Sequence, residues 1–110
     1  MKIGVLTIDP FEQQIRKKLT KYTSEEKIFL KKNYIYEIFT KHGIQEFEID
    51  YLFDAKRILR IYPNIAFPER IDAEINAGKN HRLKIIFMFD PVVQGQRLQN
   101  KIGIITAFKL

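Results

Sequence analysis

Two strongly apolar segments near the C-terminus constrain the fold more than any other feature of the chain. Residues 83–89 (LKIIFMF) and 102–108 (IGIITAF) are rich in β-branched and aromatic side chains and are shorter than a typical core helix, which favours strands. A polar connection that contains a glycine separates them, so they are predicted to form a β-hairpin at the centre of a sheet. Alternation in the second strand predicts two opposite faces: Ile102, Ile104, Thr106 and Phe108 against Ile105 and Ala107.

The size and composition of the chain fit a single domain that spans residues 1–110. The 110 residues are 45% apolar and include nine Phe and five Tyr, which is enough material for one core. Cysteine is absent, which excludes a disulfide framework and a thiolate metal site. The apolar stretch before Asp9 and Pro10 is too short for a signal sequence or a membrane span. We therefore expect a soluble, cytoplasmic protein that makes no contact with a membrane.

The N-terminal half is predicted to contain one strand followed by two helices. Residues 2–8 are mostly apolar and end at a turn signal, and residues 11–22 carry apolar side chains at helical spacings on one stripe. The sequence TSEE at residues 23–26 is a capping box, which satisfies backbone groups at the start of a helix. A long helix is therefore predicted to follow and to end at His42 and Gly43.

Strands dominate the predicted second half. Residues 44–55 fit a helical and a strand template, and we favour a short helix. Residues 56–62 and 71–77 are predicted strands, and the turn 78–80 leads into the hairpin. Sequential strands favour antiparallel pairing, so the fold class is α+β: a mainly antiparallel sheet of four to five strands packed by two or three helices. The predicted core contains Val5, Leu6, Ile15, Leu19, Ile35, Phe39, Ile85, Phe87, Ile104 and Phe108.

Charge is segregated along the chain, whose formal net charge is +6. Residues 11–42 carry eight Lys or Arg against four Asp or Glu, residues 43–74 carry four against seven, and residues 75–110 carry six against one. Two basic segments are able to form one face that binds a polyanion such as RNA; the alternative is an ordinarily solvated surface. On the first interpretation, folding brings helical lysines beside hairpin cations: Lys17, Lys21, Lys31 or Lys32 beside Arg82 and Lys84.

The sequence gives little support for a metal or a cofactor. The chain has two histidines, His42 and His81, and they do not fall in a ligand-spaced motif. Glu46, Asp50 and Asp54 would share one face of a helix, where an exposed acidic stripe is more common than a cation site. A Gly-rich phosphate loop and a nucleophile elbow are both absent from the sequence. We therefore expect neither a metal nor a cofactor.

Basic residues around the hairpin suit metal-independent cleavage of RNA. That reaction needs a group that takes the proton of the 2′-hydroxyl, cations that stabilise the phosphorane and a proton donor for the leaving 5′-oxygen. The candidate catalytic residues are His42, His81, Arg82 and Lys84. The candidate RNA-binding residues are Arg97, Lys101 and Lys109. The alternative is that these cations only solvate a face of the sheet.

Short motifs from Lys41 onward resemble a known family. They are KHGI at residues 41–44, EFE at 46–48, FD at 53–54, RLKIIF at 82–87 and IITA at 104–107. Together they are similar to BrnT-type toxins, small RNases of the RelE-like superfamily. The resemblance implies a metal-independent RNase toxin whose basic surface binds an antitoxin.

The chain departs from the family pattern at Gly103 and Phe108, where the family has arginine, and residues 2–22 have no counterpart in it. If the arginines contact phosphate, Arg82, Arg97 or Lys109 must substitute for them. The departures favour a second interpretation, a non-catalytic interaction protein such as an immunity or inhibitor protein or a phage-encoded binder. Such a protein would use an edge of the sheet or the acidic residues 46–54.

Overall fold

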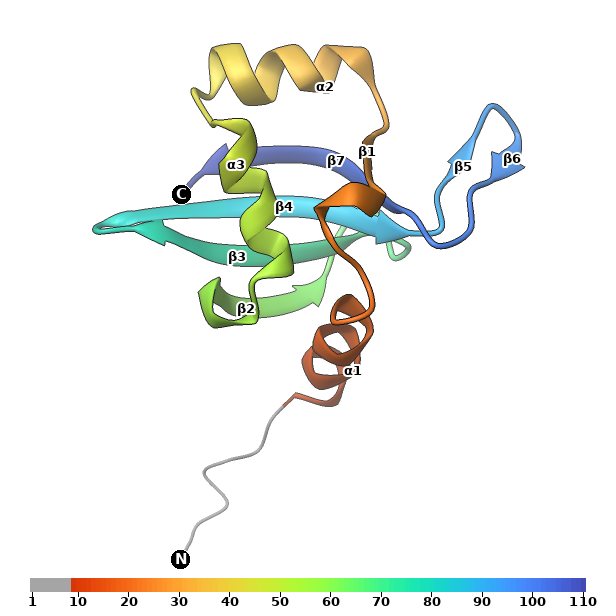
Figure 1. Ribbon diagram of the computed structural model, residues 1–110, viewed down its shortest axis with the longest axis horizontal. Helices are drawn as coiled ribbons and strands as arrows, with labels where there is room; N and C mark the ends of the chain where they lie inside the picture. Colours follow the sequence, from red (N-terminus) through yellow and green to blue (C-terminus); the bar gives the residue numbers. More distant parts are fainter. Residues whose placement is uncertain (1–8) are drawn as a thin grey trace, which may run out of the picture.

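The computed structural model describes residues 9–110 and shows an α+β fold around a five-stranded sheet (Figure 1). The strand order is β1-β7-β4-β3-β2, with β1 parallel to β7 and the other neighbours antiparallel. The strands are β1 (Lys27–Phe29), β2 (Ile58–Pro63), β3 (Ile71–Gly78), β4 (His81–Phe89) and β7 (Ile102–Lys109). The helices are α1 (Pro10–Leu19), α2 (Lys32–Tyr36) and α3 (Glu46–Ile49). This arrangement confirms the predicted fold class.

The strand predicted over residues 2–8, with Val5 and Leu6, lies outside the described residues. The central hairpin, in contrast, forms as predicted, because β4 and β7 pair antiparallel over almost their whole length. Their connection folds into a further ribbon, β5 (Val92–Val93) and β6 (Gln96–Arg97), which the sequence analysis did not predict. The ribbon projects beyond the sheet in Figure 1.

A bulge in β7 changes the predicted faces of that strand. The register shifts at Ile105, directly after Ile104. The extra residue reverses the alternation, so Ala107 faces the core while Thr106 and Phe108 face outward. The predicted grouping of Thr106 and Phe108 with Ile104 on one face is therefore wrong.

The capping box is present but does not start the long helix that it predicted. The Glu26 side chain accepts the backbone N–H of Thr23 at 2.7 Å, and the box closes a single 3₁₀ turn, Ser24–Glu26. The chain then extends as β1, because these residues gain a backbone partner in β7. Lys27 also reaches the carboxylate of Asp50 at 2.6 Å. Tertiary pairing thus overrides a local helix signal.

The helices after β1 end close to the predicted positions. α2 continues as a π-helical turn over Glu37–Lys41, and Gly43 takes the left-handed conformation of a helix end, with φ of 65°. α3 continues as a 3₁₀ turn over Asp50–Phe53, which confirms the short helix favoured for that segment. β2 and β3 confirm both strands predicted before the hairpin. Across residues 9–110, none of the helices has the length and apolar composition needed to span a membrane.

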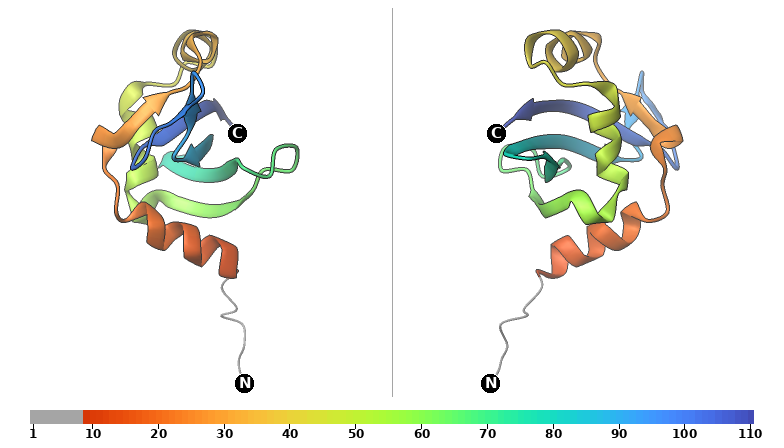
Figure 2. Two further views of the ribbon diagram at one scale, coloured as in Figure 1. Left: turned by 90° about the vertical axis from the view of Figure 1, so that its right-hand side faces the viewer. Right: turned by 60° about the vertical axis from the view of Figure 1, so that its left-hand side comes forward.

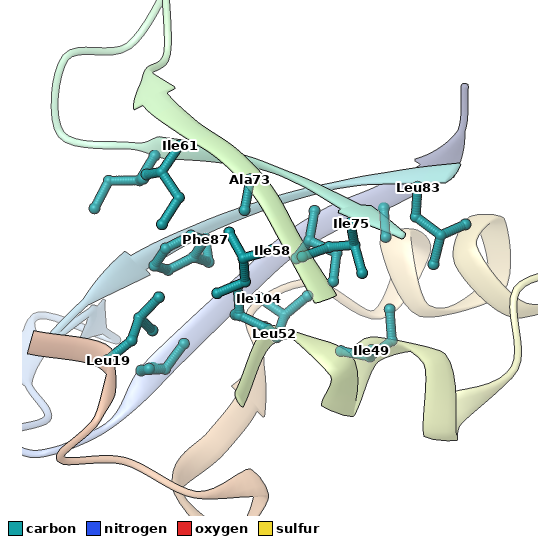
Figure 3. Close-up of a cluster of buried hydrophobic side chains, with 14 of the residues drawn as sticks. Leu19, Ile49, Leu52, Ile58, Ile61, Ala73, Ile75, Leu83, Phe87 and Ile104 are labelled. Carbon is teal, nitrogen blue, oxygen red and sulfur yellow. The ribbon is translucent and has the colours of Figure 1, made fainter. Parts of the chain in front are cut away.

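The core lies between one face of the sheet and the elements α1 and α3 (Figure 3). Of the described residues predicted for the core, five are buried: Ile15, Leu19, Ile85, Phe87 and Ile104. The other three are only partly buried: Ile35, Phe39 and Phe108. Phe108 turns outward because of the bulge, and in the helical segment it is Ile38 that is fully buried.

Helix α1 closes the free edge of β2 with an ion pair. Glu12 and Arg16, one helical turn apart, lie 3.0 Å from each other. Glu12 Oε1 accepts the backbone N–H of Ile61 at 2.8 Å, and Arg16 donates to the carbonyl of Ile58 at 2.8 Å. The strand then ends at Pro63, which has no N–H. The ion pair therefore takes the place of a neighbouring strand along this edge.

Replacing both Glu12 and Arg16 by alanine is expected to make the chain self-associate. Loss of the pair frees the Ile61 N–H and the Ile58 carbonyl, and an unpaired strand edge is a template for another copy. Light scattering after gel filtration should show masses above the 13.1 kDa of one chain. Lys17→Ala, on the exposed side of α1, is the matched control. A double variant of unchanged mass would contradict this role of the ion pair.

Candidate functional site

The face of the sheet opposite the core has no helix packed across it in the part of the chain that the structure describes (Figures 1 and 2). α2 borders this face beyond β7, which lies between the edge strand β1 and β4. Cross-strand register places Arg60 opposite Glu74, Glu74 opposite Lys84, and Tyr62 opposite Asp72. We call these five residues the open-face cluster.

Short polar contacts join the open-face cluster into one network. Tyr62 donates its phenolic hydrogen to Glu74 Oε2 at 2.6 Å, and Arg60 Nε lies 3.5 Å from the same oxygen. Lys84 Nζ lies 3.5 Å from Asp72 Oδ2 and 5.2 Å from the centre of the Tyr62 ring. Two carboxylates, two cations and one phenol are therefore joined by a continuous series of neighbouring contacts.

The surroundings of the cluster shift the ionisation of Tyr62 and Lys84. Burial raises the pKa of Tyr62, and its hydrogen bond to Glu74 raises that pKa further, against an opposing effect of Lys84. Hydrogen bonding to Tyr62 raises the pKa of Lys84 by more than burial lowers it, and Asp72 adds to the increase. At neutral pH the cluster therefore holds a neutral phenol beside a charged ammonium group.

Alkaline pH is expected to destabilise the protein through Tyr62. A pKa raised by folding means that the folded state binds the proton more tightly, so this stabilisation is complete below the ordinary tyrosine pKa of 10.0 and is lost as pH rises through the folded-state value. Tyr62→Phe should therefore reduce the fall in Tm between about pH 9 and about pH 11. Tyr36→Phe, at a tyrosine that is 64% exposed, is the control. Equal falls in Tm for both variants would contradict the prediction.

Phe108 connects the open-face cluster to His42. Lys84 Nζ lies 5.9 Å from the centre of the Phe108 ring, and the ring centres of Phe108 and His42 lie 6.3 Å apart. His42 comes from the end of the helical segment that follows α2 and is half-buried. The structure thus gathers two predicted catalytic residues, His42 and Lys84, around one aromatic ring.

The other two predicted catalytic residues have different surroundings. His81 Nε2 lies 2.9 Å from Glu48 Oε2, and because Glu48 is only 7% exposed, this contact ties α3 to the start of β4. Arg82 is exposed and lines a shallow hollow beside the turn 78–80. Alternation along β4 puts Arg82 on the same face as Lys84, so Arg82 extends the open-face cluster and His81 does not.

The three predicted RNA-binding residues do not converge on one site. Lys109 pairs with Leu83, whose buried side chain faces the core, so Lys109 and Lys84 lie on opposite faces of the sheet. The Arg97 side chain donates to the carbonyl of Asp90, and the backbone carbonyl of Lys101 accepts the N–H of Asp90, so both residues lie at the far end of the hairpin. Lys84 and Asp90 are six positions apart along the chain, which is about 20 Å of extended strand.

The lysines of the helical segments do not lie beside Arg82 and Lys84, as had been predicted. Lys17 of α1 and Lys21, which follows this helix, line a hollow with Asp90, beyond the end of β4. Lys31 lines a groove with Met88, also toward that end of β4. The prediction that these lysines join the cations at the start of β4 is therefore wrong, because α1 runs along β2 and delivers its lysines to the opposite end of the sheet.

The acidic segment is neutralised by basic side chains. Lys27 reaches Asp50 at 2.6 Å and Glu46 at 3.8 Å, and Asp54 pairs with Arg57 at 3.6 Å. Within residues 9–110, no three His, Cys, Asp or Glu side chains gather in a way that could hold a metal ion. The acidic residues instead attach α3 and the following turns to their neighbours.

Packing explains the glycine at one position where the family pattern has arginine. A Cβ atom at Gly103 would lie 2.8 Å from Leu30 Cδ1, because the Leu30 side chain occupies that space. A longer side chain would have to displace Leu30. At the second position, Phe108 supplies the ring between Lys84 and His42.

Four members of the open-face cluster were not predicted from the sequence: Arg60, Tyr62, Asp72 and Glu74. The signal for the two carboxylates was the alternation in IDAEINA at residues 71–77, which puts Asp72 and Glu74 on one face of a strand. The tight turn to the next strand then brings Glu74 opposite Lys84. Two alternating patterns read together would have placed this carboxylate beside this lysine.

No protein-family model, curated protein or solved structure matches this chain. The resemblance to BrnT-type toxins therefore depends on the motifs from Lys41 onward.

Proposed function

We propose that this chain is a small metal-independent endoribonuclease of the toxin type that acts on the open face of its sheet. The observation that carries the proposal is the open-face cluster, which puts a carboxylate, a neutral phenol and an ammonium group side by side on the face of the sheet that no described helix crosses. The resemblance from Lys41 onward supports the same function. The substrate is RNA in the cytoplasm, and the protein partner is an antitoxin that covers this face.

Each step of RNA cleavage has a candidate group in this region. Glu74, which is bonded to Tyr62, takes the proton of the 2′-hydroxyl as that oxygen attacks phosphorus. Lys84 and Arg60 stabilise the charge on the phosphorane. His42 gives a proton to the 5′-oxygen as its bond to phosphorus breaks. The products are a 2′,3′-cyclic phosphate and a free 5′-hydroxyl.

Residues around the cluster suit a single-stranded substrate. Phe108 is partly exposed beside Lys84 and offers a ring on which a base can stack. Arg82 lies two residues before Lys84 on the same face of β4 and can contact a neighbouring phosphate. Of the three predicted RNA-binding residues, Arg97 and Lys101 lie too far away to contact the same phosphate, and Lys109 lies on the other face of the sheet, because it pairs with the buried Leu83.

Purified protein is expected to cleave single-stranded RNA in the presence of EDTA. Glu74→Gln retains an acceptor for Tyr62 but removes the base, so it should lower the cleavage rate by about 100-fold or more. Lys32→Ala, at an exposed lysine of α2, is the control and should leave the rate unchanged. Cleavage that requires added Mg²⁺, or that persists in Glu74→Gln, would contradict the proposal.

The second candidate is a non-catalytic interaction protein. It is favoured by the pairing of Lys84 with Asp72 and of Arg60 with Glu74, which leaves few cations free for phosphate. Induced expression in a bacterial host separates the two functions. Growth arrest that Glu74→Gln relieves supports the RNase, whereas harmless expression together with one co-purified protein partner supports the interaction protein.

A further inference from the structure

We propose that a groove at the far end of the open face binds an extended segment of a partner protein that carries an apolar side chain next to a carboxylate. The groove measures about 400 Å³, within the size range of ligand sites. Met88 of β4 and Ile105 of β7 lie beneath it, and Leu30 lines one side. The inference does not depend on RNA cleavage, because Met88 lies four residues along β4 from Lys84, at a distance of about 13 Å.

Two hydrogen-bonded loops form the other walls of the groove. The ribbon β5–β6 contributes Val92 and Val93 and is closed by its own backbone pairing. The loop of residues 64–70 contributes Arg70, and Asn64 holds this loop by accepting the backbone N–H of Phe67 at 2.9 Å. Walls that are in place before binding reduce the entropy lost when a partner docks.

The composition of the groove suits an apolar side chain better than a nucleotide base. Among the described residues that line it none is aromatic, and bases bind to proteins largely by stacking on aromatic rings. The flexible thioether of Met88 adapts to apolar side chains of different shape. Apolar residues on the adjoining loops extend the surface that a partner can cover, since Val92 is 51%, Phe67 46% and Ile65 101% exposed.

Charge at the rim of the groove favours a carboxylate on the partner. Lys31 and Arg70 both line the groove, and within residues 9–110 neither forms an ion pair. Glu69 stands at the same rim, so one positive charge is left in excess. A single carboxylate balances that excess, whereas a chain of phosphates would bring more negative charge than the rim can balance.

Random peptides displayed on phage and selected against the full chain test this inference. The enriched peptides are expected to share an apolar residue next to Asp or Glu. Arg70→Glu reverses a charge at the rim, so it should weaken the binding of these peptides by at least about tenfold. Peptides selected against this variant should carry Lys or Arg in place of Asp or Glu. Lys56→Glu, in the turn before β2, is the matched control and should leave the affinity for the peptides unchanged. Met88→Lys, which puts a charge beneath the groove, should abolish their binding.

Several outcomes would overturn the inference. One is the absence of any enriched peptide, and another is equal affinity of the enriched peptides for the unchanged chain and for Arg70→Glu. Binding of a single-stranded RNA oligonucleotide that shifts the NMR signals of Met88 and Val93, without peptide enrichment, would assign the groove to nucleic acid. A dimer that buries Met88 without any peptide would assign it to a second copy of this chain.

Discussion

Truncating Phe87 to alanine is expected to lower the free energy of unfolding by about 3 to 5 kcal/mol. Phe87 is fully buried in β4, opposite Ile104 of β7, and it meets Phe89 edge to face with ring centres 5.7 Å apart. Alanine loses the transfer energy of the ring and leaves a cavity that the paired strands cannot close. Because small domains are stable by only about 5 to 15 kcal/mol, the variant should lie close to unfolding.

Denaturant titration followed by circular dichroism measures this effect. Ile104→Ala should cost about 2 to 5 kcal/mol for the same reason. Ile65→Ala, at a side chain that is 101% exposed, is the control and should change the free energy of unfolding by less than about 0.5 kcal/mol. Losses under about 1 kcal/mol at both buried positions would show that the hairpin does not form the centre of the core.

Replacing Lys84 with methionine is expected to lower the rate of RNA cleavage by about 100-fold to 1,000-fold under the proposed function. The ammonium group of Lys84 lies next to Asp72, Tyr62 and Phe108 on the open face, where a phosphorane would develop its charge. Methionine retains most of the apolar stem but supplies no positive charge. The rate of cleavage of a fluorescent RNA oligonucleotide in EDTA is the measurement.

Lys84 also stabilises the fold, and a second variant separates the two roles. The Asp72 side chain is only 7% exposed, so loss of its lysine partner leaves a buried charge and lowers stability. The double variant Lys84→Met with Asp72→Asn removes that charge, and the residue can still accept the hydrogen bond from Asn64. We expect the double variant to regain stability but not activity. Recovery of cleavage would show that Lys84 has a structural role only.

The candidate site was predictable in part from the sequence. Lys84 and His42 were named because cations and imidazoles are the side chains that this chemistry needs. Their neighbours Tyr62 and Glu74 were not named, because they belong to strands whose pairing had been predicted without a register. His81 was assigned to the same site, yet it contacts Glu48 on α3 instead, since adjacent residues of a strand point to opposite faces.

Local signals in the sequence by themselves determined the central hairpin, helix α1, the end of the second helical segment at Gly43 and the strands before the hairpin. Such signals act within a few residues, through side chains that favour extended backbone or satisfy the ends of helices. Only the tertiary structure decided that residues 27–29 form β1, because this strand is stabilised by pairing with β7, which is distant in the chain. It also decided the faces of β7, because one extra residue at Ile105 reverses every side chain after it. The separation of the basic segments has the same origin, since the position of α1 along β2 is determined by contacts between residues far apart in sequence.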